Sequence, residues 1–312
     1  MHYLDHAATT PVLSEAADEM LRVTTSEFGN PSSVHAAGRR ARTVVEDARD
    51  RVAAAVGASP AEIVFTGGGT EADNLAIKGV AHKRRGDGNH VVVTAFEHHA
   101  VLDAARALSQ GGFEVTKIPV EPDGTVDPQR VAGAVRPSTV LVSVMTVNNE
   151  IGTIQDLTSI AEAVRAVNPR ALVHTDAVQA LGNVPVDLHA WGVDLAAFAA
   201  HKAGGPKGVG ALFVRSSVAI EAVLHGGGQE RGLRSGTHNV AGIAGFGVAA
   251  EIAAKEVHEK ADRLASLRDR LLEGITAQVP DVVVNGGLDR RVAGNLNVCI
   301  PGTDGETMLL LL

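Results

Sequence analysis

Short apolar runs alternate with helical patterns through the first two thirds of the chain. The apolar runs are rich in Val, Ile, Leu and Phe and occupy residues 62–65, 90–95, 114–118, 140–145, 171–176, 193–200 and 211–215. Helical patterns lie between the early ones, at residues 71–83, 100–110, 128–135 and 157–167. Strands with few polar positions are typical of a sheet buried on both faces. The pattern therefore predicts an α/β fold, with a mostly parallel sheet between two layers of helices.

The two ends of the chain carry further elements. A long amphipathic helix is predicted near the N-terminus, since seven apolar residues share one helical stripe: Ala41, Val44, Val45, Ala48, Val52, Ala55 and Val56. Residues 238–278 are helical throughout, and strand patterns follow at 282–285 and 295–300. We expect residues 13–250 to form a large domain, with residues 1–12 and 251–312 belonging to a smaller α+β domain.

The last residues, "GETMLLLL", have the pattern of a helix that begins at Glu306 and shows no stop signal. We therefore expect the chain to be incomplete at its C-terminus, with apolar surface exposed from Leu309 to Leu312.

Composition excludes several classes of partner. The 312 residues are 45% hydrophobic, carry a formal net charge of −8 and contain no basic run, so we expect no binding to nucleic acid or acidic membranes. No run of about 18 apolar residues or signal-like N-terminus is found. The single cysteine, Cys299, excludes an internal disulfide framework and favours a reducing, cytoplasmic location.

Ligands of open α/β sheets bind beyond the carboxyl ends of the strands, so the residues that follow each strand are the candidates. The first strand is followed by "TGGGTEADN", residues 66–74, a glycine turn that runs into a helix. Free N–H groups at a helix N-terminus favour an anion such as phosphate. The plainer interpretation is an ordinary turn, in which Thr70 and Asp73 have the spacing of a capping box.

Histidines follow the second strand. Adjacent side chains of an extended segment point to opposite faces, so His98 and His99 are not expected to bind one metal ion together, and we predict no metal site. One of them is either a strand-end histidine without function or a ring that stacks on a ligand and carries protons.

Later strands end in amide, acidic and basic residues. Asn148 and Asn149 follow residues 140–145, and Asp176 and then Gln179 follow another apolar run. An aspartate at the end of a buried strand is either functional or the cap of the next helix. Lys202, after residues 193–200, is either a salt-bridged structural lysine or an amine with a lowered pKa that can form an imine.

A phosphate cradle, an aspartate, a histidine and a lysine at the strand ends of one sheet suit pyridoxal 5′-phosphate (PLP). This cofactor needs a lysine for its Schiff base, an acid against its pyridinium nitrogen and an anion site for its phosphate.

These residues resemble the cysteine desulfurases of the NifS/IscS type, PLP enzymes of the class V aminotransferase group with fold type I architecture. The resemblance extends over nearly the whole chain. It rests on these motifs, in the family's order: "YLDHAATTP", "FGNPSSVHAAGR", "EIVFTGGGTEADNLAIKG", "EHHAVLD", "VNNEIGTIQD", "HTDAVQALG", "HKAGGPKGVGALFVR" and "GGGQERGLRSGTHN".

The resemblance implies a role for each candidate. Lys202 corresponds to the lysine that holds PLP and then moves the substrate's α-proton, and His98 to the histidine stacked on the cofactor ring. Asp176 corresponds to the partner of the pyridinium nitrogen. The remaining positions correspond to contacts with the ring's phenolic oxygen, namely Gln179 and Asn149, and with the phosphate, namely Gly69, Thr70, His201 and, from a neighbouring subunit, Thr237.

The family converts L-cysteine into L-alanine. A cysteine thiolate on a mobile loop takes the sulfur as a persulfide and passes it to iron–sulfur cluster scaffolds or to tRNA thiolation proteins. The resemblance therefore implies a homodimeric transferase with sulfur-acceptor proteins as partners.

The chain departs from the family's pattern at two places. It contains no "GSAC"-like segment, which carries the family's nucleophile, and Cys299 lies in a strand pattern where a cysteine is typically a small buried residue. Ala199 stands where the family has a hydroxyl near the phosphate, so we expect weaker PLP binding. Two alternatives stay open: a PLP-dependent selenocysteine or cysteine lyase, and an inactive dimeric scaffold.

Overall fold

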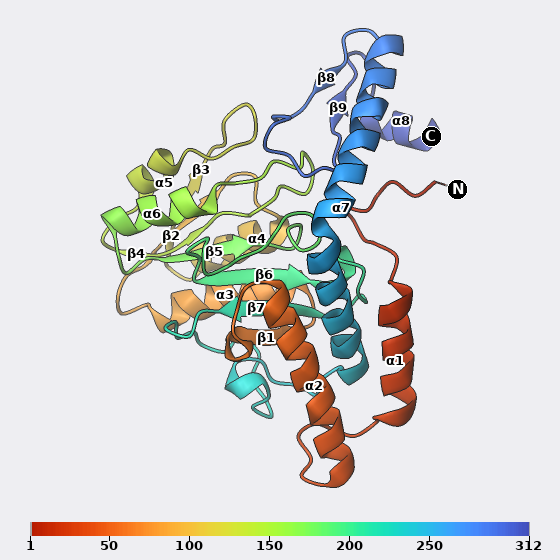
Figure 1. The fold of residues 1–312 in the computed structure, drawn as a ribbon. Helices are drawn as coiled ribbons and strands as arrows, with labels where there is room; N and C mark the ends of the chain where they lie inside the picture. The colour runs from red at the N-terminus through yellow and green to blue at the C-terminus, as the bar shows by residue number, and fades with distance from the viewer. Residues whose placement is uncertain (1, 312) are drawn as a thin grey trace.

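The computed structural model describes residues 2–311 and contains a seven-stranded sheet between layers of helices (Figure 1). The strands run in the order β1-β7-β6-β5-β4-β2-β3. Only β7 is antiparallel to its neighbours, which confirms the predicted mostly parallel sheet. The bounds are β1 (Ile63–Thr66), β2 (His90–Thr94), β3 (Glu114–Ile118), β4 (Thr139–Ser143), β5 (Leu172–Asp176), β6 (Leu195–Ala199) and β7 (Gly210–Val214).

Alternate residues of each central strand enter separate cores on the two faces of the sheet. In β2, Val92 contributes to one core, whereas Val91 and Val93 contribute to the other. Helices α3 (Gly69–Lys83) and α4 (His99–Gln110) cover the second face. The first face is covered by α2 (Ala36–Ala55), α5 (Pro128–Ala134), α6 (Leu157–Val167) and the beginning of α7 (Val240–Gln278). This double coverage explains why the strands are apolar on both faces.

The remaining elements are short or lie at the edge of the molecule. Helix α1 (Ser14–Ser26) packs against α7, as Figure 1 shows. The predicted strands near the C-terminus form a small antiparallel pair, β8 (Val283–Val284) with β9 (Val298–Cys299), followed by α8 (Gly305–Leu311). Three 3₁₀ turns complete the described residues: η1 (Pro60–Glu62), η2 (Ala200–Lys202) and η3 (Glu230–Gly232).

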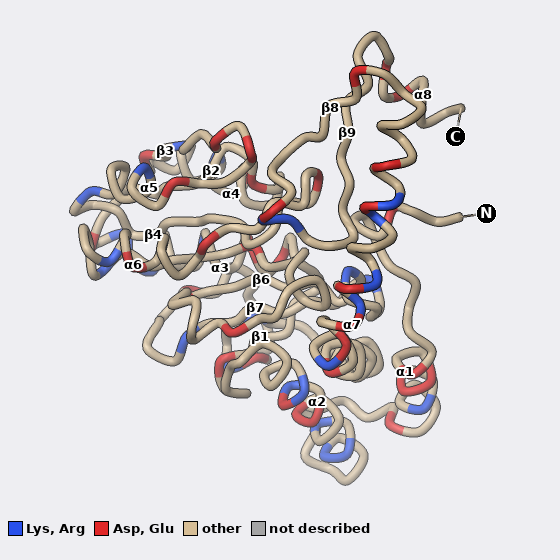
Figure 2. The backbone as a smooth tube through the Cα atoms, turned by 45° about the horizontal axis from the view of Figure 1, so that its top comes forward, with Lys and Arg blue, Asp and Glu red and all other residues tan. Residues whose placement is uncertain are grey.

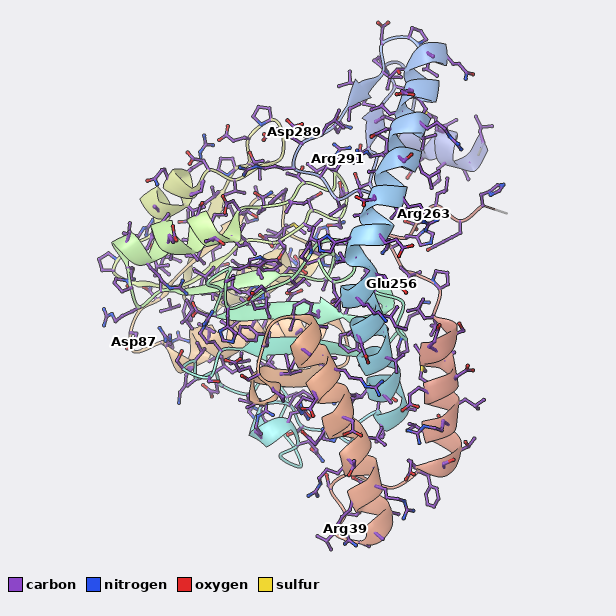
Figure 3. The ribbon with its side chains drawn as sticks, viewed as in Figure 1. Arg39, Asp87, Glu256, Arg263, Asp289 and Arg291 are labelled. Carbon is purple, nitrogen blue, oxygen red and sulfur yellow. The ribbon has the colours of Figure 1, made fainter. Side chains whose placement is uncertain are left out.

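The predicted domain boundary at residue 250 lies inside α7, whose buried residues are concentrated before Ala250. Figure 3 shows Glu256 and Arg263 further along the same helix, and Arg291 on the loop between β8 and β9. The division of the chain into two domains stays a prediction.

Two local predictions were wrong. Helix α3 begins at Gly69 after Gly68 and no side chain caps it, so Thr70 and Asp73 form no capping box; Asp73 is instead buried. Cys299 was expected to be buried but is exposed, on a two-stranded sheet that is separate from the large one. The exposure predicted for the last leucines is confirmed for Leu309 to Leu311, whereas Leu312 lies outside the described residues.

Acidic and basic residues are interspersed along α2 and α7 in Figure 2. Among residues 2–311, no helix has both the length and the apolar character needed to cross a membrane.

Candidate active site

All but one of the predicted site residues line a single cavity of about 570 Å³. A cavity of this size suits a cofactor or a small substrate. The predicted residues in its wall are Gly69, Thr70, His98, Asn149, Asp176, Gln179, His201 and Lys202.

The parallel strands bring these residues together. Asp176 is the last residue of β5, and Lys202 lies in η2, directly after β6. His98 and Asn149 follow β2 and β4. Since the carboxyl ends of parallel strands meet at one edge of a sheet, four separate segments reach the same cavity.

The glycine turn before α3 forms one wall of the cavity. In a helix that begins at Gly69, the first N–H groups have no acceptor within the helix and can bind an anion. A Cβ atom on Gly69 would lie 2.6 Å from Cγ2 of Val178, so a side chain does not fit there. Gly68 has a φ of 151°, which a residue other than glycine rarely adopts. The turn therefore has the features of a phosphate cradle.

Lys202 is held by the N-terminal segment of the chain. Its Nζ donates hydrogen bonds to the carbonyl oxygens of Ala7 and Ala8, the latter over 2.9 Å. Gln179 Nε2 donates to the same Ala7 oxygen over 2.8 Å. Burial lowers the pKa of Lys202, while Asp176 and Asp5 act in the opposite direction. Among the described residues no carboxylate pairs with Lys202, so the salt-bridged interpretation is not supported, and the reactive amine stays a prediction.

Asp176 both lines the cavity and stabilises the next turn. Its Oδ1 accepts a hydrogen bond from the Val178 N–H over 2.9 Å. Burial raises the pKa of Asp176, whereas the Val178 N–H, His98 and Lys202 favour its charged form. Within the described part of the chain, no helix lies between β5 and β6, so the predicted helix cap is wrong and Asp176 instead stabilises a turn. Its functional role stays a prediction.

Of the two adjacent histidines, only His98 lines the cavity. His98 lines the cavity and caps α4, with Nδ1 accepting from the Ala100 N–H over 3.1 Å. The His99 side chain is 86% exposed. Within residues 2–311, no group of three or more His, Cys, Asp or Glu side chains is arranged to hold a metal ion.

His201 lies beside the N-terminal segment. Its Nδ1 lies 3.1 Å from Thr9 Oγ1, and its backbone carbonyl accepts from both the N–H and the hydroxyl of Thr10. Burial lowers the pKa of His201, and Lys202 and Lys207 lower it further.

Thr237 is the one predicted site residue outside this cavity. It lines a separate hollow of about 290 Å³ together with Phe28, Asn30 and His238. Its predicted contact belongs to a neighbouring subunit, so the geometry of one chain leaves that role a prediction.

Several residues of the cavity were not predicted from the sequence. Asp5, Ala7 and Ala8 close it from the N-terminal side, and Asp73 and Met145 also contribute to its wall. The motif "YLDHAATTP" was the available signal for the first three. Nothing in its composition indicated a contact with Lys202.

The comparisons with known proteins agree with this geometry. Residues 2–312 match the family model described as "Aminotransferase class-V". The chain belongs to this family. A cysteine desulfurase named IscS from Clostridium botulinum is 46% identical over 310 residues, which is 99% of this chain and 78% of the relative. The predicted resemblance to the NifS/IscS type is therefore confirmed.

Several solved structures are similar to this chain in fold and sequence. A structure titled "NIFS-LIKE PROTEIN" is 41% identical, with a TM-score of 0.97, over 99% of this chain and 84% of the other. A structure titled "SspA in complex with cysteine" is 34% identical, with a TM-score of 0.87, over 100% of this chain and 87% of the other. The predicted PLP fold type I architecture is thus confirmed.

PLP is the cofactor of this class V family, and the protein is a PLP-dependent enzyme. The residues of the cavity fit the group. An amine is available in Lys202, a buried carboxyl in Asp176, and an anion cradle in the turn that ends at Gly69. These are the three groups that PLP requires.

Proposed function

We propose that this protein is a cysteine desulfurase, which converts L-cysteine and an acceptor thiol into L-alanine and a persulfide. The carbon–sulfur bond of the substrate breaks, a sulfur–sulfur bond forms on the acceptor, and a proton replaces sulfur on the β-carbon. The relative named cysteine desulfurase and the similar structure in complex with cysteine support this substrate. The observation that carries the proposal is the single cavity shared by Lys202, Asp176 and the turn at Gly69.

Different residues in the wall of the cavity would bind different parts of the cofactor. Gly69, Thr70 and His201 would hold the phosphate, and Asp176 would pair as a carboxylate with the ring nitrogen. Gln179 and Asn149 would contact the phenolic oxygen. When bound, PLP supplies an electron-withdrawing ring that stabilises negative charge on the substrate's α-carbon.

Lys202 and His98 move protons. Lys202 would hold the cofactor, and its amine would take the proton from the α-carbon of cysteine. Its lowered pKa increases the fraction of neutral amine near neutral pH, and only the neutral amine can accept a proton. His98 is within the same cavity and serves as the second proton carrier.

The acceptor thiol is not Cys299. This cysteine is the only one in the 312 residues, and it is exposed on β9 without lining the cavity. We propose that the sulfur passes to a thiol outside these residues and then to acceptor proteins such as an iron–sulfur scaffold. We also propose a homodimer in which Thr237 completes the phosphate site of the other subunit, which light scattering would test.

Deuterium exchange at the α-carbon of L-cysteine tests the proposed chemistry without requiring the acceptor thiol. The purified protein, loaded with PLP, is incubated with L-cysteine in D₂O, and loss of the α-proton signal is followed by NMR. We expect exchange by the wild-type protein and by Cys299→Ala, and none by Lys202→Arg.

Lys207→Arg is the matched control, because Lys207 is exposed nearby and does not line the cavity. Absence of exchange in a protein that has bound PLP would contradict the proposal and favour an inactive dimeric scaffold. Exchange that is lost in Cys299→Ala would contradict the assignment of that cysteine.

A further inference from the structure

A buried polar cluster extends from the wall of the cavity, to which Asp73 belongs, to the sheet that α3 covers. Asp73 belongs to α3, His174 to β5, and Glu97 to the segment between β2 and α4. All three are buried, and each has one side-chain atom without a hydrogen-bond partner among the described residues: Asp73 Oδ1, Glu97 Oε2 and His174 Nε2. Buried polar atoms are rarely left without a partner, so their meeting in one cluster calls for a physical reason.

Only one of the two carboxyl oxygens of Glu97 accepts hydrogen bonds from the described residues. Its Oε1 accepts from Thr94 Oγ1 over 2.5 Å and from the Met145 N–H over 2.8 Å. Its Oε2 has no donor, and no Lys or Arg in residues 2–311 forms an ion pair with it. A charged carboxylate at such a position would cost several kcal/mol of desolvation without compensation.

Asp73 faces a histidine rather than a fixed cation. Its Oδ1 lies 3.5 Å from His174 Nε2, and His174 Nδ1 lies 2.8 Å from Ser143 Oγ. The His174 side chain is fully buried. Burial lowers the pKa of His174 to about 3, so this ring is neutral near neutral pH and cannot balance a charge on Asp73.

The charged groups near Asp176 differ from those near Asp73. Asp176 on β5 is faced by Lys202 from η2 and His98 from the start of α4, both of which favour its ionised form. For Asp73, the interacting charges are the carboxyls of Asp176 and Glu97. Burial of all three carboxyls, together with the repulsion of Asp73 and Glu97 by Asp176, opposes ionisation of the three at once.

We propose that Asp73 and Glu97 are positioning residues that stay protonated and neutral, which leaves Asp176 as the single carboxylate charge against the cofactor ring. The inference rests on the proposed role of Asp176. Burial raises the pKa of Glu97 to about 8, and burial followed by repulsion from Asp176 and Glu97 raises that of Asp73.

The pH dependence of stability tests this protonation state. A carboxyl whose pKa is raised in the folded state stabilises the protein below its unfolded pKa, and this contribution is lost as pH rises through the folded pKa. For Glu97, the loss falls between its ordinary pKa of 4.5 and about 8. An amide cannot ionise. Glu97→Gln and Asp73→Asn therefore remove the loss of folding stability that ionisation of each carboxyl causes.

Thermal unfolding is measured for the wild type and both amide variants from about pH 4 to about pH 9, with and without PLP. We expect each variant to unfold at a higher temperature than the wild type at the upper end of this range, and at a similar one at the lower end. Glu162→Gln and Asp18→Asn are matched controls on exposed carboxyls and should follow the wild type throughout. Amide variants that are less stable than the wild type at the upper end would overturn the proposal, because they would have lost a stabilising charge.

Infrared spectroscopy gives a second readout that does not depend on the folding of a variant. A protonated carboxylic acid has a carbonyl stretching band that a carboxylate lacks. We expect the wild-type protein near neutral pH to show this band for buried carboxyls and to lose it as pH rises above about 8. Absence of the band near neutral pH would overturn the proposal.

The tests of this protonation state can succeed or fail independently of the test of the proposed function. Both measurements work on the protein without substrate, whereas deuterium exchange tests Lys202. In the loaded protein, the visible absorbance of PLP should depend less on pH in Glu97→Gln than in the wild type, which a purely structural role of Glu97 would not produce.

Discussion

Lys202 Nζ donates a 2.9 Å hydrogen bond to the backbone oxygen of Ala8, although 194 residues separate the two in the chain. The N-terminal segment therefore forms part of the cavity instead of merely preceding the fold. Thr10 anchors this segment: its hydroxyl donates to the His201 carbonyl and accepts from the Gly204 N–H, each over 2.9 Å.

Replacement of Thr10 by valine should weaken PLP binding. The isosteric side chain removes both hydrogen bonds, each worth about 1 kcal/mol, and releases the segment that holds Lys202. We expect a protein less stable by about 2 kcal/mol and a lower PLP affinity, measured by thermal unfolding and by fluorescence titration of PLP. Thr24→Val on the exposed side of α1 is the control, and equal effects of the two variants on PLP affinity would refute the anchoring role.

Most of the fold was predictable from the sequence because its central strands are buried on both faces. Val91 to Val93 give an unbroken apolar run, since neighbouring residues enter opposite cores. Helix α6 has the predicted bounds, because Asp156 caps its start and its apolar stripe is continuous. The burial predicted for Cys299 was wrong, since alternation in a strand does not reveal whether another element packs against that strand.

The candidate site was predictable where its residues lie at the ends of strands, as Asp176 and Lys202 do. The predicted capping box of Thr70 and Asp73 was wrong. The spacing of two residues cannot show that the helix already begins at Gly69, after Gly68. The approach of Ala8 to Lys202 depends on how distant segments pack. A local pattern contains no information on such a contact.

Replacement of Ala199 by serine should tighten PLP binding. Ala199 lines the cavity, and its Cβ lies 3.5 Å from the position that a Cβ on Gly69 would occupy. A hydroxyl there can donate to the phosphate, and a hydrogen bond to a charged group contributes about 1.5–3 kcal/mol. We expect the dissociation constant of PLP, measured by titration, to fall about tenfold. Ala203→Ser, outside the cavity wall, should leave it unchanged, and an unchanged constant in Ala199→Ser would show that this position does not reach the phosphate.

Glu230 should stabilise the fold in a pH-dependent way. It pairs with Arg49 over 2.7 Å and with His238 over 2.6 Å, and it accepts from the Phe65 N–H. Although burial by itself raises the pKa of Glu230, the hydrogen bonds from Arg49 and His238 lower it to about 2. A lowered folded pKa stabilises the protein above the unfolded value of 4.5, and this contribution is lost as pH falls towards about 2.

Glu230→Gln should therefore cost about 3–5 kcal/mol near neutral pH, because the buried Arg49 loses its buried carboxylate partner and keeps only the exposed Glu46. The difference from the wild type should narrow as pH falls below 4.5 in denaturant unfolding experiments. Glu19→Gln, which breaks an exposed pair with Arg22, should cost less than about 1 kcal/mol. A difference for Glu230→Gln that does not vary with pH would contradict the role of its charge.

Borohydride reduction of the PLP-loaded protein, followed by peptide mapping with mass spectrometry, tests the central claim most directly. Reduction fixes the cofactor on the amine that holds it. We predict a pyridoxyl group on Lys202 in the wild type and in Lys207→Arg, and none in Lys202→Ala. A colourless protein that takes up no PLP, or a label on any other lysine, would contradict the assignment of this cavity as the active site.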